Sequence, residues 1–114
     1  MRHDEAYLLD MLVAARKALT FAAELTYPQF VRSDLHQNAI FKVLEIVGEA
    51  AARVGEDTKQ AHPEISWHQI VGLRNRIVHA YFEIDLEVVW RIVRGDLPEL
   101  ISQLEPLVPP ESES

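Results

Sequence analysis

The sequence predicts an all-α bundle of about five helices. Apolar residues recur at helical spacing in almost every segment, and no segment alternates polar and apolar residues for long enough to predict a strand. At 114 residues, with 48% hydrophobic and 25% charged residues, the chain suits one globular domain. Together these observations favour a single bundle of antiparallel helices that bury apolar stripes against one another.

The first predicted helix carries an apolar stripe that begins at Leu8 and continues to Leu25. Asp4 is its expected N-cap. Tyr27-Pro28 is its expected end, because the residue before a proline is disfavoured in the α region.

The second predicted helix opens at Ser33 and carries the apolar residues Leu35, Ile40, Val43, Leu44, Val47, Ala50, Ala51 and Val54. Gly55 is its expected C′ residue. Gly48 lies inside this helix, where glycine costs about 1 kcal/mol relative to alanine, and a close backbone approach is the expected reason for it. Both helices span roughly 20 residues, or about 30 Å, which predicts an antiparallel pair that forms the spine of the bundle.

The next segment, residues 56–65, is polar and is expected to form a short helical turn and a loop. Ser66 followed by Gln69 matches a capping box and predicts a helix that ends near Tyr81. Asp85 is the expected cap of a further helix.

Gly95-Asp96-Leu97-Pro98 is expected to interrupt that helix. A last helix should then continue to about Leu107, before Pro109-Pro110 ends it. We therefore expect a helical domain over residues 1–108 and a disordered tail over 109–114.

Several classes of protein do not fit the composition. Without cysteine, neither a disulfide framework nor a thiolate zinc site can form. No apolar run reaches the roughly 18–20 residues of a membrane span, and the charged N-terminus is unlike a secretory signal, so a soluble, cytoplasmic protein is expected. His3, His36, His62 and His68 lack metal-ligand spacing, so neither a metal nor a cofactor is predicted.

The net charge of −7 argues against a nonspecific nucleic-acid coat protein, because phosphate binding needs a basic surface. A local basic cleft is still possible. Arg74 and Arg76 lie close together, and Arg91 and Arg94 follow on the next segment.

Five polar residues gather on an otherwise apolar helix: Arg74, Asn75, Arg76, His79 and Tyr81. Asn75 and His79 are four residues apart and share a helix face. Arg74 is turned about 140° from His79 on the helix, so it would reach the imidazole only by its long side chain or meet His79 of a second chain.

These groups suit metal-free RNA cleavage. Histidine can act as acid or base near neutral pH, and arginine binds phosphate and stabilises its developing charge. Taken alone, however, an arginine five residues before a histidine is common by chance, and a single helical histidine is more often a surface or core residue.

Other residues carry less information. Glu45 and Glu49 share a helix face and could form a carboxylate pair, but a solvated face is the favoured interpretation. Trp67 and Trp90 are expected to anchor a core or an interface rather than to stack on bases.

The pattern Arg74-Asn75-x-x-x-His79, extended as Arg-x4-His-x-Tyr to Tyr81, resembles the signature of HEPN domains of the HepT-like toxin family. The run 43–51 (VLEIVGEAA), the segments 63–67 and 72–75, and the segments 89–90 and 96–100 also resemble this family. The resemblance covers residues 7–107.

The resemblance implies a HEPN-type antiparallel helical bundle that is the ribonuclease toxin of a toxin–antitoxin pair. It implies a homodimer in which two motifs face a shared cleft, an RNA substrate such as tRNA or mRNA, and an MNT-type nucleotidyltransferase antitoxin that transfers AMP to Tyr81. Arg74 and His79 would then be catalytic, with Asn75 orienting them, whereas the role of Arg76 stays open. The alternatives are a noncatalytic nucleotide- or substrate-binding subunit of a nucleotidyltransferase, or a pure interaction protein.

Overall fold

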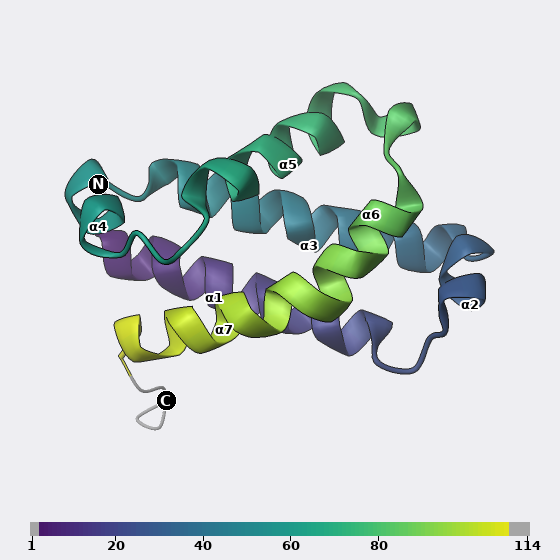
Figure 1. Ribbon diagram of the computed structural model, residues 1–114, viewed down its shortest axis with the longest axis horizontal. Helices are drawn as coiled ribbons and strands as arrows, with labels where there is room; N and C mark the ends of the chain where they lie inside the picture. The colour runs from purple at the N-terminus through teal and green to yellow at the C-terminus, as the bar shows by residue number, and fades with distance from the viewer. Residues whose placement is uncertain (1–2, 110–114) are drawn as a thin grey trace.

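Two long antiparallel helices, α1 (Asp4–Ala22) and α3 (Asp34–Arg53), form the spine of the bundle (Figure 1). The computed structural model describes residues 3–109, and within that range it contains helices and no strand. The predicted all-α bundle and its antiparallel spine are therefore confirmed.

The apolar stripes of α1 and α3 face each other and form most of the core. The fully buried residues of these two helices include Met11, Ala15, Ala18, Ala22, Ile40 and Ala51. Leu35 departs from the prediction, because 76% of its surface is exposed. It lies in the first turn of α3, where its side of the helix is left uncovered.

The chain between the two spine helices differs from the prediction. Helix α1 already ends at Ala22, and Pro28 lies in the first turn of a separate short helix, α2 (Tyr27–Val31). Proline fits there because the first turn of a helix does not use its N–H groups internally. Thr26 and Gln29 form a reciprocal capping box that starts α2.

Asp4 is the first residue of α1 rather than its N-cap, a position taken by His3. Its carboxylate accepts hydrogen bonds from the Gly55 N–H, at 3.2 Å, and from the Thr58 hydroxyl, at 2.6 Å. These bonds, with the Thr58 bond the stronger cause, hold the pKa of Asp4 below its usual range. Asp4 thus ties the start of α1 to the start of α4 (Glu56–Ala61).

The two ends of α3 were predicted only in part. Ser33 caps α3 as expected, accepting from the His36 N–H. Gly55 follows the end of α3, but its φ of −69° is not left-handed. Extended backbone at Val54 ends the helix instead.

Helix α5 (Trp67–His79) carries the predicted site and packs against α3. Ser66 occupies the N-cap position, but its side chain makes no capping hydrogen bond, so the predicted capping box is absent. Its ψ of 64° lies outside the extended conformation that an N-cap normally adopts.

Residues 86–104 form one continuous helical rod, in which α6 (Leu86–Arg91) passes through η2 (Ile92–Asp96) into α7 (Leu97–Leu104) (Figure 1). Asp85 caps α6, as predicted. The predicted break at residues 95–98 is wrong, because η2 is a wider π turn in which the Leu97 N–H donates to the Ile92 carbonyl. Pro98 then falls in the first turn of α7, where its missing N–H is tolerated.

The rod ends in a 3-10 turn, η3 (Glu105–Leu107), close to the predicted end. Residues 110–114 of the predicted tail lie outside the described residues, so the domain boundary at 108 stays a prediction. No helix in the described part of the chain is long and apolar enough to span a membrane.

Candidate functional site

The close approach predicted at Gly48 occurs where α5 crosses α3. A Cβ atom on Gly48 would lie 2.8 Å from Cγ of Arg74 and 3.1 Å from the carbonyl oxygen of Ile70, and closer still to Cβ of Arg74. These distances are shorter than normal van der Waals contacts. Glycine is therefore required at this crossing, and it lets the stem of Arg74 lie directly on the backbone of α3.

The guanidinium of Arg74 is held at this crossing by two side chains. Its Nη1–H donates a hydrogen bond of 2.9 Å to Oδ1 of Asn75, and its Nη2 lies 3.5 Å from Oε2 of Glu49. Its Nε is buried and has no hydrogen-bond partner among residues 3–109. Because a guanidinium has five N–H donors, the partly exposed terminal nitrogens keep N–H groups for a further acceptor.

His79 is the last residue of α5 and is exposed. Within the described chain its imidazole makes no hydrogen bond, either to Arg74 or to another residue. The two residues are five apart on α5, which places them about 140° apart around the helix. Among the motif residues, Asn75 is the one whose side chain hydrogen-bonds to Arg74.

Tyr81 begins a 3-10 turn, η1 (Tyr81–Glu83), that follows α5. Its hydroxyl donates a hydrogen bond to Oδ1 of Asn38 on α3. Its ring meets the ring of Phe41 edge-on, with the centroids 5.5 Å apart. Tyr81 is therefore anchored to α3 although 39% of its surface is exposed.

Sequence reasoning did not connect three residues to the motif: Asn38, Phe41 and Glu49. All three lie on α3, and each contacts a motif residue that follows much later in the chain. For Glu49, a solvated face was favoured, but its carboxylate pairs with Arg74. The sequence signal that could have indicated this ion pair is the neighbouring Gly48. A helix that packs closely on Gly48 also passes next to Glu49.

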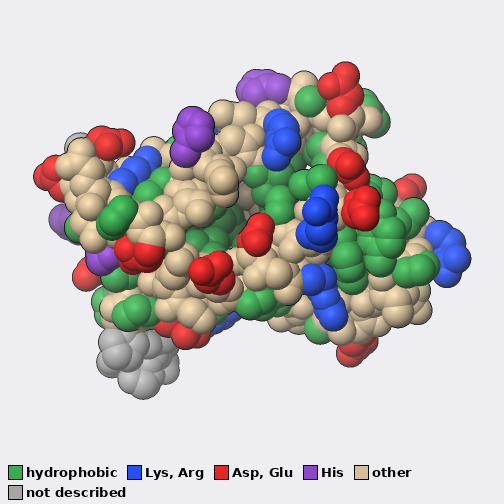
Figure 2. Space-filling model, viewed as in Figure 1, with side chains coloured by type: hydrophobic (Ala, Val, Ile, Leu, Met, Phe, Trp, Pro, Cys, Tyr) green, Lys and Arg blue, Asp and Glu red, His purple; other side chains and the backbone are tan. Residues whose placement is uncertain are grey.

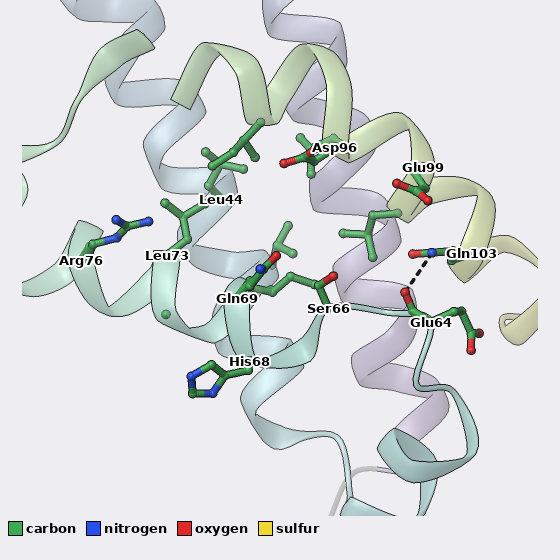
Figure 3. Close-up of a pocket in the computed structure, with 16 residues that line it drawn as sticks. Leu44, Glu64, Ser66, His68, Gln69, Leu73, Arg76, Asp96, Glu99 and Gln103 are labelled. Carbon is green, nitrogen blue, oxygen red and sulfur yellow. Dashed lines mark hydrogen bonds between the residues drawn. The ribbon is translucent and has the colours of Figure 1, made fainter. Parts of the chain in front are cut away.

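A cleft of about 610 Å³ separates α5 from the η2–α7 rod (Figure 3). Its floor is apolar and includes Leu44, Leu73 and Leu97. Figure 2 shows hydrophobic side chains within this hollow and acidic side chains beside it. The lining carboxylates, Glu64, Asp96 and Glu99, would repel phosphate, so the cleft does not suit an RNA backbone.

Two other arginines, Arg76 and Arg94, lie in different parts of the structure. Arg76 is exposed and borders the cleft (Figure 3), whereas Arg74 is not among the residues that line it. Arg94 lies over the ring of Trp90, 5.3 Å from its centroid, and donates to the Ala22 carbonyl at the end of α1. Arg74, by contrast, is an arginine of the motif whose guanidinium is held by side chains of both α3 and α5.

The two tryptophans have structural contacts, as expected. Trp67 is buried and donates from its indole N–H to the His62 carbonyl. Trp90 packs on Phe30, with ring centroids 5.1 Å apart. In the part of the chain that the structure describes, no group of three His, Asp or Glu side chains could hold a metal ion.

The fold and the site define a class: a small helical bundle with a fixed, partly exposed arginine and an exposed histidine on one helix. Such groups can bind an anion and transfer a proton. The ribonuclease HepT-like family model matches residues 11–107. The chain therefore belongs to the ribonuclease HepT-like family, and the predicted HEPN-type bundle and ribonuclease class are confirmed at this level.

Two relatives named as ribonucleases match this chain in sequence over almost their whole length. The chain is 35% identical to "Probable ribonuclease HepT" of Thermococcus cleftensis, over 93% of this chain and 96% of that protein. It is 34% identical to "Putative RNase MJ1380" of Methanocaldococcus jannaschii, over 91% of this chain and 95% of that protein. No solved structure gives a significant match.

Proposed function

We propose that this protein is the toxin of a toxin–antitoxin pair and cleaves RNA internally without a metal ion. The observation that carries the proposal is the held guanidinium of Arg74, whose terminal nitrogens keep free N–H groups at a partly exposed surface. The exposed imidazole of His79 on the same helix supports it. A fixed cation can stabilise the charge on the reacting phosphate, and a free imidazole can act as the base or the acid.

In the proposed reaction, His79 accepts the proton of a ribose 2′-hydroxyl as the 2′-oxygen bonds to the adjacent phosphorus. Arg74 stabilises the charge that grows on the phosphate oxygens. The bond from phosphorus to the 5′-oxygen breaks, and a protonated imidazole returns a proton to that oxygen. The products carry a 2′,3′-cyclic phosphate and a 5′-hydroxyl.

A homodimer would supply the second imidazole, because each chain contributes one His79. Three exposed apolar residues support an interface beside the motif; we call Leu35, Val78 and Phe82 the apolar patch. Phe82 is 98% exposed and Val78 is 40% exposed. Each of the three lies within one helical turn, along the chain, of Tyr81 or of its partner Asn38. We propose that these exposed side chains contribute to one interaction surface in the dimer.

The proposed antitoxin is a nucleotidyltransferase that moves AMP from ATP onto the Tyr81 oxygen, with release of pyrophosphate. The exposure of Tyr81 at the end of α5 supports this step. A bulky anionic group there would repel RNA by charge and block it sterically.

The test is to incubate the purified protein with RNA in the presence of a chelator. We expect 2′,3′-cyclic phosphate ends, and no cleavage by His79→Ala. His68→Ala is the matched control, since His68 is also exposed on α5 but lies in its first turn. Undiminished cleavage by His79→Ala would disprove the assigned chemistry, and wild-type protein that binds nucleotide but cuts no RNA would support the noncatalytic alternative.

A further inference from the structure

We propose that Glu49 is a positioning residue for Arg74, and that it fixes the guanidinium in the orientation that stabilises the reacting phosphate. This inference rests on the proposed ribonuclease function. Its starting point is the ion pair between Oε2 of Glu49 and Nη2 of Arg74, at 3.5 Å. The two residues come from different helices, so the pair ties the site to the α3–α5 crossing.

The stem of Arg74 has little freedom before the ion pair forms. Its Cβ and Cγ lie against the backbone of α3 at Gly48, and its Nε is buried. The remaining freedom is mainly at the end of the side chain. Glu49 and Asn75 restrain that end from two directions, one on each terminal nitrogen.

The charge of Glu49 makes a positioning role distinguishable from a binding role. A carboxylate beside the phosphate site repels RNA, so its removal favours substrate binding. Its removal also frees the guanidinium, which weakens stabilisation of the transition state, because that depends on donors that are already oriented. Loss of Glu49 should therefore lower kcat without raising KM.

Glu45 provides the matched control. It lies one turn earlier on the same face of α3, is also partly buried, and makes no hydrogen bond or ion pair with Arg74 or another motif residue in the described structure. Glu45→Ala removes the same charge from the same helix and leaves the restraint on Arg74 intact.

We expect Glu49→Ala to lower kcat by about tenfold with an unchanged or lower KM. Glu49→Gln, which keeps the length and an oxygen acceptor, should recover most of the loss. Glu49→Asp should not, because its carboxylate is one methylene too short. Glu45→Ala should keep the wild-type kcat. Wild-type kcat in Glu49→Ala, or equal losses in both alanine variants, would overturn the proposal.

A second measurement does not depend on catalysis. Side-chain NMR of the arginines, with the Arg74 signals assigned from Arg74→Lys, reports how restrained its terminal Nη–H groups are. We expect a restrained Arg74 in the wild type and in Glu45→Ala, and a mobile one in Glu49→Ala. An Arg74 equally restrained in Glu49→Ala overturns the positioning role. A wild type that restrains Arg74 but cleaves no RNA refutes the proposed function instead.

Discussion

Gly48 on α3 lies directly against the side chain of Arg74 on α5, with no room for a Cβ atom between them. The contact that joins these two helices therefore also determines how close the side chain of the motif arginine lies to the backbone of α3. Packing and site geometry are coupled at this point, so one methyl group should disturb both.

We expect Gly48→Ala to destabilise the protein by up to about 2 kcal/mol. Alanine would gain about 1 kcal/mol in helix propensity, but the added Cβ overpacks the crossing, which typically costs about 1–3 kcal/mol. The nearest backbone atom, the Ile70 carbonyl oxygen, cannot rotate away as a side chain could. Urea unfolding followed by circular dichroism measures the change.

Gly72→Ala is the matched control for this prediction. Gly72 is an interior residue of α5, and a Cβ atom there would meet nothing within 4 Å. The helix-propensity gain should therefore appear alone, as an increase of about 1 kcal/mol in the free energy of unfolding. If both alanine variants were more stable than the wild type, the close approach at Gly48 would be refuted.

The bonds from Asp4 to Gly55 and Thr58 predict a pH-dependent contribution to stability. Because the pKa of Asp4 is lowered in the folded state, its contribution is present above the pKa of the unfolded chain and is lost as the pH falls through the lower, folded value. Asp4→Ala should therefore lower Tm at neutral pH, and the difference from the wild type should shrink in strong acid.

Glu5→Ala is the control for Asp4→Ala. Glu5 shares the first turn of α1 and so has the same favourable place at the helix N-terminus, but it has no hydrogen-bond partner within the described residues. Thermal unfolding followed at several pH values separates the two effects. Equal Tm losses in both variants at neutral pH would show that the hydrogen bonds of Asp4 contribute nothing specific.

Helical periodicity predicted the two long helices and α5, because it follows from spacing along one helix, and the cost of a glycine inside a helix predicted the close approach at Gly48. Periodicity could not show that Leu35 would be exposed, since spacing identifies an apolar side but not whether another element covers it. Nor could it pair Glu49 with Arg74 or Tyr81 with Asn38, because each pair joins two helices. The π turn at η2 was missed because glycine and proline usually mark a break.

Tyr81→Phe should separate the modification of the motif tyrosine from its structural contacts. Phenylalanine keeps the ring contact with Phe41 and loses the hydrogen bond to Asn38, which should cost about 1 kcal/mol or less at this exposed site. It also removes the oxygen that would accept AMP. We expect the variant to cleave RNA and to remain active when the nucleotidyltransferase partner and ATP are added.

Tyr27→Phe is the corresponding control. Tyr27 is exposed to a similar extent and packs on Trp90, away from α5. This variant should still be inactivated by the partner and gain AMP at Tyr81, as mass spectrometry of the modified peptide would record. Inactivation of Tyr81→Phe to the same extent as the wild type would exclude Tyr81 as the site of control.

The apolar patch predicts the effect of a charge at the proposed dimer interface. Phe82 is 98% exposed, and its ring meets that of its neighbour Tyr81. Phe82→Asp loses this one exposed ring contact and should change the stability of the single chain only a little. In a dimer that buries this residue, the unpaired carboxylate would be costly, and we expect the dissociation constant to rise at least about tenfold, or 1.4 kcal/mol.

Sedimentation velocity over a range of concentrations measures this change, and Val13→Asp provides the control. Val13 is an exposed apolar residue of α1 that does not belong to the apolar patch, so its charge should not affect self-association. RNA cleavage measured on the same samples links assembly to activity, because a reaction that needs two copies of His79 should fall as the dimer dissociates. A Phe82→Asp variant that dimerises like the wild type would show that the chains associate through a different surface.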